Sequence, residues 1–332
     1  MKNFLNKHNI IAITMIIVGL GVFLYPWLFE MPKVQDLNYK NLQKIKKTDN
    51  NSSSFSFAVF GDNKNSIFSF PKLINKLNKE NISFSVETGD LIDNMIDGNS
   101  EYKIYLKQIA KIKKPFFVVP GNHETEGMSG AYYYIFGKAY YSFSFRNSYF
   151  LMLDGSHETG MGYEEFNWLK KQLQIAKNYK HIFIFFHIPI HDPVKDSIVK
   201  AQFDEPFALK LQNLLDKYKI DMIFTAHQHG YFTGKWGNSP YTVTGGAGAE
   251  LGGDDVKHFF HHYVLVDVNG TQVSYKVIQI LKPTDSLIAQ FLHNMKEFVS
   301  MYALAHWDLF LILFGFVYLS VYNCIILKWR KK

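Results

Sequence analysis

Residues 86–94, with the sequence VETGDLIDN, decide how the rest of the chain is arranged. They continue an apolar run that begins at Phe84 and predicts a buried strand. Gly89 permits a tight turn at the end of that strand, so we expect Asp90 at the edge where open α/β sheets place their ligands. A single Gly-Asp turn is more often structural than metal-binding. The prediction of a site therefore depends on the residues at the other strand ends.

The same arrangement recurs elsewhere in the chain, where other apolar runs end in residues of metal-binding types. These residues are Asp62, Asn122, His187, His227 and His229. Because the carboxyl ends of parallel strands meet at one edge of a sheet, we expect them to form one metal-binding rim with Asp90. His227 and His229 are two residues apart, so both can face this rim. Each histidine alone is more often a packed or surface residue, and it is the ordered set that favours a metal site.

Apolar runs of strand length alternate with segments of helical periodicity from residue 54 onward. The predicted strands are 55–60, 84–86, 116–119, 181–186 and 220–225, and the predicted helices are 71–79, 101–112, 163–176 and 206–218. Repeated β-α-β order calls for a mostly parallel sheet with helices on its faces. A hairpin is predicted for residues 141–145 and 149–153. Later runs at 241–244, 259–268 and 272–281 lack helices between them, which favours an antiparallel second sheet.

Composition limits the class of protein. The chain has 332 residues, 47% hydrophobic and 17% aromatic, which excludes a disordered protein. The net charge of +7 comes from the ends, because residues 1–29 and 309–332 contain six basic residues and no acidic one. Residues 30–308 contain 30 basic and 29 acidic residues, so nucleic acid is not the expected partner, although a local basic patch is left open. The one cysteine, Cys324, excludes an intrachain disulfide and a cysteine-based zinc site.

Two uncharged runs are long enough to cross a bilayer core of about 30 Å: residues 10–29 and residues 309–327. A cleaved signal peptide is the alternative for the first run, which is longer than a usual signal core and lacks small residues at its exit. Four basic residues follow the second run and only Lys296 stands in the 20 residues before it, which predicts a cytoplasmic tail. Two spans would place both termini in the cytoplasm and the middle domain outside it, at the plasma membrane. Three lysines after the first run oppose this topology.

The predicted organisation has five parts. They are an N-terminal transmembrane anchor (1–30), a polar linker (31–53), a catalytic domain (54–281), an amphipathic juxtamembrane helix (282–308) and a C-terminal transmembrane helix with a basic tail (309–332). The linker is rich in lysine and lacks sustained periodicity, which is typical of a tether. Apolar residues recur at helical spacing over residues 285–302. That segment is expected to pack on the domain, to lead into the membrane or to lie on the lipid.

The ordered motifs resemble the calcineurin-like metallophosphoesterase family. The matching blocks are Gly61-Asp62, Gly89-Asp90-x-x-Asp93, Gly121-Asn122-His123-Glu124, His187 and His227-x-His229. The spacings of 28 residues from Asp62 to Asp90 and 32 from Asp90 to Asn122 each suit one β-α unit. The resemblance covers residues 55–281 and implies a four-layer α-β-β-α sandwich, in which two central sheets have helices outside.

The resemblance also implies two divalent metal ions. Asp90 would bridge them, since its two oxygens can hold ions about 3.5 to 4 Å apart. The remaining ligands would be Asp62 and His229 for the first ion, and Asn122, His187 and His227 for the second. Ligands of these types suit manganese, iron and zinc alike.

Further roles follow from the same resemblance. His123 would be the general acid that protonates the leaving oxygen, and Asp93 would hold its imidazole in position. His191 is a candidate for the substrate pocket, with a packing or surface role as the alternative. Arg146 is the only arginine of the predicted domain, so phosphate recognition is expected to depend on metals, histidines and lysines. The glycines of residues 245–249 are expected to let the backbone run close to the metal rim.

One departure from the family pattern concerns the first ion. The family usually has Asp-x-His in its first block, but this chain has Asp62-Asn63-Lys64. A protonated lysine cannot coordinate a cation. The first ion would then have at most three protein ligands and be held more weakly. Lys64 is expected to contact the substrate phosphate as a point charge, with exposure to solvent as the alternative.

The function expected from these observations is hydrolysis of a phosphomonoester or phosphodiester by a metal-activated hydroxide at a membrane. A membrane-proximal or lipid-linked substrate, such as a lipid headgroup, fits the tethering, and no protein partner is inferable. The alternative is a catalytically impaired metal-binding membrane scaffold or sensor. A nuclease is disfavoured by the near-neutral middle of the chain.

Overall fold

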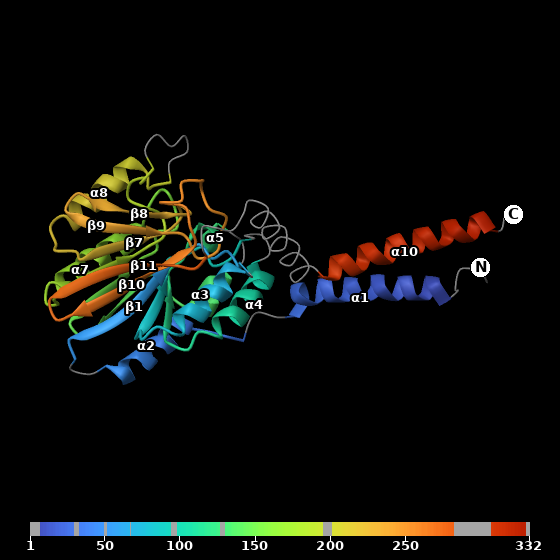
Figure 1. The fold of residues 1–332 in the computed structure, drawn as a ribbon, viewed down its shortest axis with the longest axis horizontal. Coiled ribbons are helices and arrows are strands. Elements are labelled where there is room, and N and C mark those ends of the chain that lie inside the picture. Colours follow the sequence, from blue (N-terminus) through green and yellow to red (C-terminus); the bar gives the residue numbers. More distant parts are fainter. Residues whose placement is uncertain are drawn as a thin grey trace. The chain divides into compact units, whose positions relative to one another are not determined.

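The computed structural model describes residues 7–29, 33–49, 52–66, 68–93, 98–126, 130–194, 201–281 and 307–329. The chain divides into two compact units. The larger is Val34–Gln290, and the smaller combines Met1–Lys33 with Phe291–Lys332. Figure 1 labels the elements of both.

The first sheet of the larger unit has five strands in the order β11-β10-β1-β2-β3. The strands are β1 (Ser54–Phe60), β2 (Phe84–Glu87), β3 (Phe116–Val118), β10 (His262–Asn269) and β11 (Gln272–Gln279). The pairs β1–β2 and β2–β3 are parallel, as the β-α-β pattern predicts. The β10–β11 hairpin adds to the other side of β1 with antiparallel pairing. This sheet is therefore mixed.

The second sheet has six strands in the order β4-β5-β6-β7-β9-β8. The strands are β4 (Tyr141–Phe145), β5 (Ser148–Met152), β6 (His181–Phe185), β7 (Met222–Thr225), β8 (Tyr231–Trp236) and β9 (Ser239–Thr244). The predicted hairpin at residues 141–153 is confirmed as β4–β5. Strands β5, β6, β7 and β9 run parallel to one another. Strand β8 lies at the edge of the sheet and pairs antiparallel with β9.

The prediction that the late strands form a second, antiparallel sheet of their own is wrong. The β10–β11 hairpin joins the first sheet, whereas β9 joins the second sheet next to β7. A missing helix between two runs indicates antiparallel pairing between them but does not select the sheet they join. Strand β8 was not expected, because its alternation is interrupted by Gly234 and Lys235, which suit an exposed edge strand.

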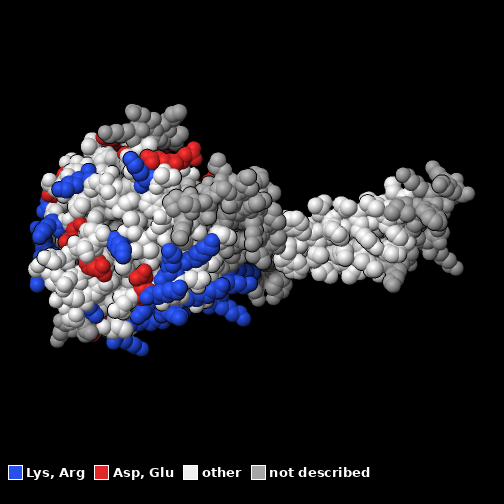
Figure 2. Space-filling model, in the orientation of Figure 1, with Lys and Arg blue, Asp and Glu red and all other residues white. Residues whose placement is uncertain are grey.

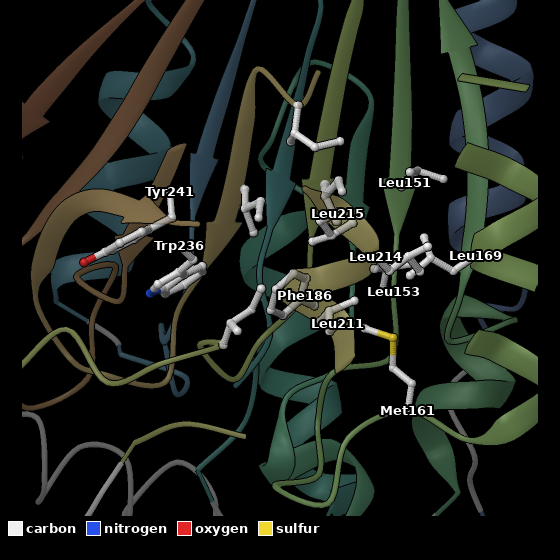
Figure 3. Packing of buried hydrophobic residues seen from close by; sticks show 14 of the residues in the cluster. Leu151, Leu153, Met161, Leu169, Phe186, Leu211, Leu214, Leu215, Trp236 and Tyr241 are labelled. Atoms are coloured by element: carbon white, nitrogen blue, oxygen red, sulfur yellow. The ribbon is translucent and has the colours of Figure 1, made fainter. Parts of the chain in front are cut away.

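Helices cover the outer faces of both sheets, which gives four layers (Figure 1). On the first sheet these are α3 (Ser69–Leu77), α4 (Gly98–Ile109) and α6 (Ala131–Phe136), and on the second α7 (Tyr163–Ala176) and α8 (Glu205–Leu215). Figure 3 shows Leu169 of α7 and Leu211 and Leu214 of α8 packed near Leu151 and Leu153. The predicted α-β-β-α sandwich is confirmed for this unit.

A third core fills the space between the two sheets and is dominated by phenylalanine. Along β1 the side chains alternate: Phe55, Phe57 and Val59 join this central core, whereas Ala58 and Phe60 join the core under the helices. Phe57 stacks on Phe84 at 5.2 Å between ring centroids. A strand with both faces buried reads as one continuous apolar run, and this is why the strand patterns in this chain are easy to recognise.

Helix α2 (Leu37–Thr48) caps the free edge of the first sheet at β3. The Asn38 side chain accepts a bond from Val118 N at 3.1 Å and donates to Val118 O at 3.2 Å. The Asn41 side chain donates to Phe116 O at 2.6 Å, and Ile45 is buried in the central core. The prediction of a polar linker over residues 31–53 is therefore wrong for 37–48. Its buried face consists of two asparagines and one isoleucine, so a search for apolar periodicity overlooks it.

The lysines of the larger unit are unevenly spread. Figure 2 shows basic side chains gathered over the region of α2, α3 and α4. We call this the basic face; its exposed lysines are Lys40, Lys44, Lys46, Lys47, Lys76, Lys79, Lys107, Lys111, Lys113 and Lys114. A near-neutral total charge thus coexists with a local basic surface.

The smaller unit contains two helices, α1 (Lys7–Phe29) and α10 (Trp307–Trp329), which pack antiparallel. A Cβ atom added to Gly19 would lie 2.6 Å from the backbone oxygen of Asp308, so the two helices are in close contact at this glycine. Near the other end, His8 Nδ1 lies 2.7 Å from the Tyr318 hydroxyl. This close approach at a small residue is typical of helices that pair in a membrane.

Two membrane spans are not confirmed. Among the described residues, Trp307–Cys324 is the one helical stretch long and apolar enough to cross a bilayer, and the apolar stretch of α1, His8–Gly21, is shorter. The predicted juxtamembrane helix at 282–308 lies outside the described residues except for its last two positions, which begin α10.

The contact between α2 and β3 can be tested by Asn38→Ala in the full chain. The change leaves the buried N–H of Val118 without its acceptor, whereas Val118 O keeps its bonds from the Tyr132 and Tyr141 hydroxyls, so we expect a loss of about 1 to 3 kcal/mol of unfolding free energy. Urea unfolding in detergent would measure it. The exposed Lys44→Ala on the same helix serves as control, and an equal effect of the two changes would contradict this assignment.

Candidate metal centre

The backbone holds Asp62 and Asp90 side by side at the carboxyl ends of β1 and β2. Asp62 N donates to Gly89 O at 3.0 Å, and Lys64 N donates to Asp90 O at 3.1 Å. Both aspartates have left-handed backbone conformations, with φ of 58° and 53°. The turn predicted at Gly89 is present, with φ of 93°. Left-handed conformations at non-glycine residues are uncommon, and clusters of them mark functional sites.

Four polar atoms converge from four loops. His187 Nε2 lies 3.1 Å from Asn122 Oδ1 and 3.2 Å from Asp90 Oδ1, and His227 Nδ1 lies 3.2 Å from both Asn122 Oδ1 and His187 Nε2. We call Asp90, Asn122, His187 and His227 the second-ion group. Ligands about 2.0 to 2.1 Å from one metal lie roughly 3.0 to 3.4 Å from each other, so this group fits a divalent ion.

Burial keeps the histidines of this group neutral. Burial lowers the pKa of His187. Burial, and then the neighbouring His187, lowers the pKa of His227 to about 3. A neutral imidazole has a lone pair for a metal, whereas an imidazolium does not. His187 Nδ1 lies 2.8 Å from Thr88 O and donates to it, which leaves Nε2 directed at the group.

A second set of donors consists of Asp62, Asp90 and His229, which we call the first-ion group. One ligand atom of each lies within 4.8 Å of the others. Both carboxylate oxygens of Asp62 are buried without a hydrogen-bond partner, and burial, then Asp90, raises its pKa well above the usual value. A buried carboxyl with a raised pKa is either protonated or stabilised in its ionised form by a nearby cation. This group therefore has the charge for an ion, and the described part of the chain gives it three acidic or histidine ligands.

Lys64 lies at this first-ion group. Its Nζ is 3.5 Å from Asp90 Oδ2, and its side chain is only 17% exposed. The alternative that Lys64 points into solvent is therefore wrong. The ammonium also acts on His229, whose pKa is lowered to about 4 by burial and then by Lys64.

Glu124 joins two of the ligand loops, a role that the sequence alone did not reveal. Its carboxylate accepts bonds from the backbone N–H groups of Asp90, Leu91, Ile92 and Gly121 at 2.8 to 3.2 Å. Burial, and then Asp90, raises its pKa to about 8. The signal was present: Glu124 stands three residues after Gly121 at the start of α5 (Asn122–Thr125), the position of a capping box.

Glu87 is another buried carboxyl behind the rim. It accepts a bond from the Tyr105 hydroxyl at 2.6 Å and one from the Asn63 side chain. Burial raises its pKa to about 8 despite both bonds. Asn63 follows Asp62 directly, so Glu87 fixes the loop that carries that ligand.

The predicted partner of His123 is present, but through a different atom. His123 Nδ1 donates to the backbone carbonyl of Asp93 at 2.8 Å, so the expectation that the Asp93 carboxylate holds the imidazole is corrected. A carbonyl can only accept, so this bond places the proton on Nδ1 and leaves Nε2 for the reaction. His123 Nε2 lies 3.6 Å from Asp90 Oδ2, at the edge of both ion groups.

Other candidates lie as follows. His191 Nε2 donates to Gln212 Oε1 of α8 at 2.8 Å. This contact corresponds to the packing role that was the alternative to substrate binding. Arg146 donates to Ser54 O at the start of β1, the opposite end of the strand from Asp62, so it takes no part in the rim. A Cβ atom added to Gly245 would collide with Asp62 Oδ2, which confirms that the backbone there runs close to the rim.

A family model described as calcineurin-like phosphoesterase matches residues 55–231, more than half of the chain. The chain belongs to the calcineurin-like phosphoesterase family. Members of this family are metal-dependent hydrolases of phosphoric esters, with a dinuclear metal site. All the residues of the two ion groups lie inside the matched range.

Curated relatives match part of this phosphoesterase. A protein of Arcobacter nitrofigilis named "Probable glycerophosphodiester phosphodiesterase" is 28% identical over 167 residues, which cover 45% of this chain and 57% of that protein. The serine/threonine-protein phosphatase CPPED1 of Rattus norvegicus is 29% identical over 206 residues, with 54% and 64% covered. The chain thus spans less than two thirds of each.

Solved structures share the fold. A dimetal phosphatase of Danio rerio superposes with a TM-score of 0.56 at 14% identity, covering 69% of this chain and 97% of that one. GAP50, the anchor in the inner membrane complex of Plasmodium, superposes with a TM-score of 0.53 at 16% identity, covering 74% and 95%. At these identities the likeness establishes the fold alone.

Substitutions can separate the role of the His123 imidazole from that of the Asp93 side chain. If His123 has the general-acid role expected from the family resemblance, His123→Ala should lower kcat for phosphoester hydrolysis by about 10²- to 10⁴-fold. Asp93→Ala should change kcat by less than about threefold, because the backbone carbonyl remains. Steady-state kinetics on the full chain would measure both. Equal losses in the two variants would mean that the Asp93 carboxylate is the partner.

Glu87 makes stability depend on pH. Its folded-state pKa of about 8 is above the ordinary 4.5, so the folded state binds this proton more tightly, and unfolding free energy falls as pH rises from about 4.5 to 8. Glu87→Gln should flatten that slope by up to about 1.4 kcal/mol per pH unit. Urea titrations at several pH values would measure it. The exposed Glu164→Gln should keep the wild-type slope; an unchanged slope in Glu87→Gln would contradict the assignment.

Proposed function

We propose that this chain is a membrane-anchored, metal-dependent phosphoesterase that hydrolyses a phosphomonoester or phosphodiester. The observation that carries the proposal is the second-ion group, in which four ligand atoms from distant parts of the chain lie 3.1 to 3.2 Å from their neighbours. Its Asp, Asn and His ligands suit manganese, iron or zinc.

A bound ion at this group would lower the pKa of a water molecule and draw the phosphoryl group to the rim. The protein's own groups do the rest. Lys64 offers its ammonium to a phosphoryl oxygen as a point charge. His123, held at Nδ1 by the carbonyl of Asp93, gives a proton from Nε2 to the leaving oxygen. Glu124 keeps the Asp90 and Asn122 loops at a fixed separation during the reaction.

Membrane anchoring is supported by the paired helices. Large apolar side chains are exposed on both, including Ile17 and Val18 of α1 and Leu313 and Phe314 of α10. The excess of basic residues after α10 favours a cytoplasmic tail. With α1 antiparallel to α10, both termini would lie in the cytoplasm and the catalytic unit outside it.

The substrate we propose is a phosphoester at the membrane, such as a lipid headgroup. Tethering to a membrane would raise the concentration of the catalytic unit at such a substrate, and the basic face has positive charge that would attract anionic headgroups. One relative carries a glycerophosphodiester name and another a protein phosphatase name, so the family accommodates both diesters and monoesters. A contribution of His191 to substrate binding is not part of this proposal, because its imidazole is engaged by Gln212.

A metal-binding scaffold or sensor is the second candidate, and the presence of Lys64 at the first-ion group favours it. His123 weighs against it, since a binding module has no need of a proton donor beside the metal. A nuclease would bind DNA with a steep salt dependence, which a gel-shift series detects.

Hydrolysis by the full chain in detergent, with added Mn²⁺, decides between enzyme and scaffold. Bis(p-nitrophenyl) phosphate and p-nitrophenyl phosphate should turn over, and Asp90→Asn should lower kcat/KM by more than the roughly 10- to 100-fold typical of outer-shell partners. Lys44→Ala, exposed on α2, should change nothing on these soluble substrates. A metal-loaded chain without turnover would favour the scaffold.

The same preparation in bilayers tests the substrate class. A phospholipid monoester or diester should be cleaved there. If soluble diesters turn over and lipid esters stay intact, the lipid part of the proposal fails while the enzyme part stands.

A further inference from the structure

The first-ion group already contains a cation that belongs to the chain. Lys64 stands where the family pattern has a metal-binding histidine, and its Nζ lies 3.5 Å from Asp90 Oδ2, the oxygen that the second-ion group leaves free. Beside it, both oxygens of Asp62 are buried and lack a hydrogen-bond donor. The ammonium therefore sits at the carboxylate that an ion of the first group would need.

The backbone fixes Lys64 in this place. Its N–H donates to Asp90 O at 3.1 Å, and the next N–H, of Asn65, donates to Leu91 O at 3.2 Å. The side chain of Asn65 is in turn bonded to the backbone and carboxylate of Glu101. A charge tethered so close to its partner has a high effective concentration, and a free ion must compete with it.

Electrostatics disfavours both cations together. The Lys64 ammonium already offsets the charge of Asp90 at the first-ion group, and an ion at the second-ion group would offset it further. A second divalent ion would share Asp90 Oδ2 with the ammonium in a buried place where like charges repel strongly. Among the described residues, the carboxylates and imidazoles that could bind it are those of Asp62, Asp90 and His229.

We propose that the Lys64 ammonium takes the place of the first metal ion, and that the protein holds one resident divalent ion, at the second-ion group. This inference deepens the proposed function and rests on it. The second-ion group is complete without Lys64, because its four ligand atoms contact one another directly. In the reaction the ammonium supplies positive charge to a phosphoryl oxygen where a second metal ion would otherwise do so.

Metal counting on the full chain in detergent tests the proposal without an activity assay. Each protein is equilibrated with Mn²⁺, and the unbound Mn²⁺ is removed. The amount of Mn²⁺ bound per chain is then measured. Electron paramagnetic resonance reports whether two bound Mn²⁺ ions are coupled. Wild type should hold one ion per chain with an uncoupled signal. Lys64→His restores the family ligand and should hold two ions with a coupled signal.

Lys64→Met separates the ammonium from the missing ligand. It removes the charge without adding a donor, so it should take up a second ion at Mn²⁺ concentrations at which wild type keeps one. Melting curves of both variants verify that they fold. A coupled pair in wild type, or one ion in Lys64→Met at every concentration, would overturn the proposal. Failure of the proposed function is distinct: no bound ion in any variant, or no hydrolysis by the loaded chain.

Discussion

Two carboxylates buried side by side, Asp62 and Asp90, impose the constraint on which the rest of the rim depends. Charges in such a place are tolerated only when cations or donors offset them. The other buried acids near them, Glu87 and Glu124, respond by raised pKa values, and the surrounding histidines respond by staying neutral. Both oxygens of Asp62 are buried, and burial raises its pKa well above the usual value. Positive charge beside it, from a metal ion or from Lys64, stabilises its ionised form.

The sandwich, and the polar residues that meet at its rim, could be predicted from sequence because both depend on local signals. Strands buried on both faces give continuous apolar runs, and the polar residue that ends each run marks the sheet edge. Asp90, Asn122, His187 and His227 were found in this way, and the structure brings them together from loops up to 137 residues apart in the chain. The order and chemistry of the motifs then identified the family.

What sequence could not supply depends on distant pairing. The β10–β11 hairpin could have joined either sheet. In the structure it pairs with the edge of β1 that β2 leaves open. Helix α2 has too few apolar residues to be recognised. The bond from His123 to a main-chain oxygen of Asp93 is invisible in residue types, since every residue has a carbonyl. Lys64 has a left-handed backbone and a side chain directed at Asp90, and no pattern of hydrophobicity encodes either feature.

Helix α2 has a consequence for how neighbouring copies behave. A strand at the edge of a sheet is a template onto which another chain can add, and β3 is such a strand. Asn38 and Asn41 bond the main-chain groups of β3 that a foreign strand would need. These bonds within one molecule would therefore disfavour amyloid-like stacking of β3 strands between molecules.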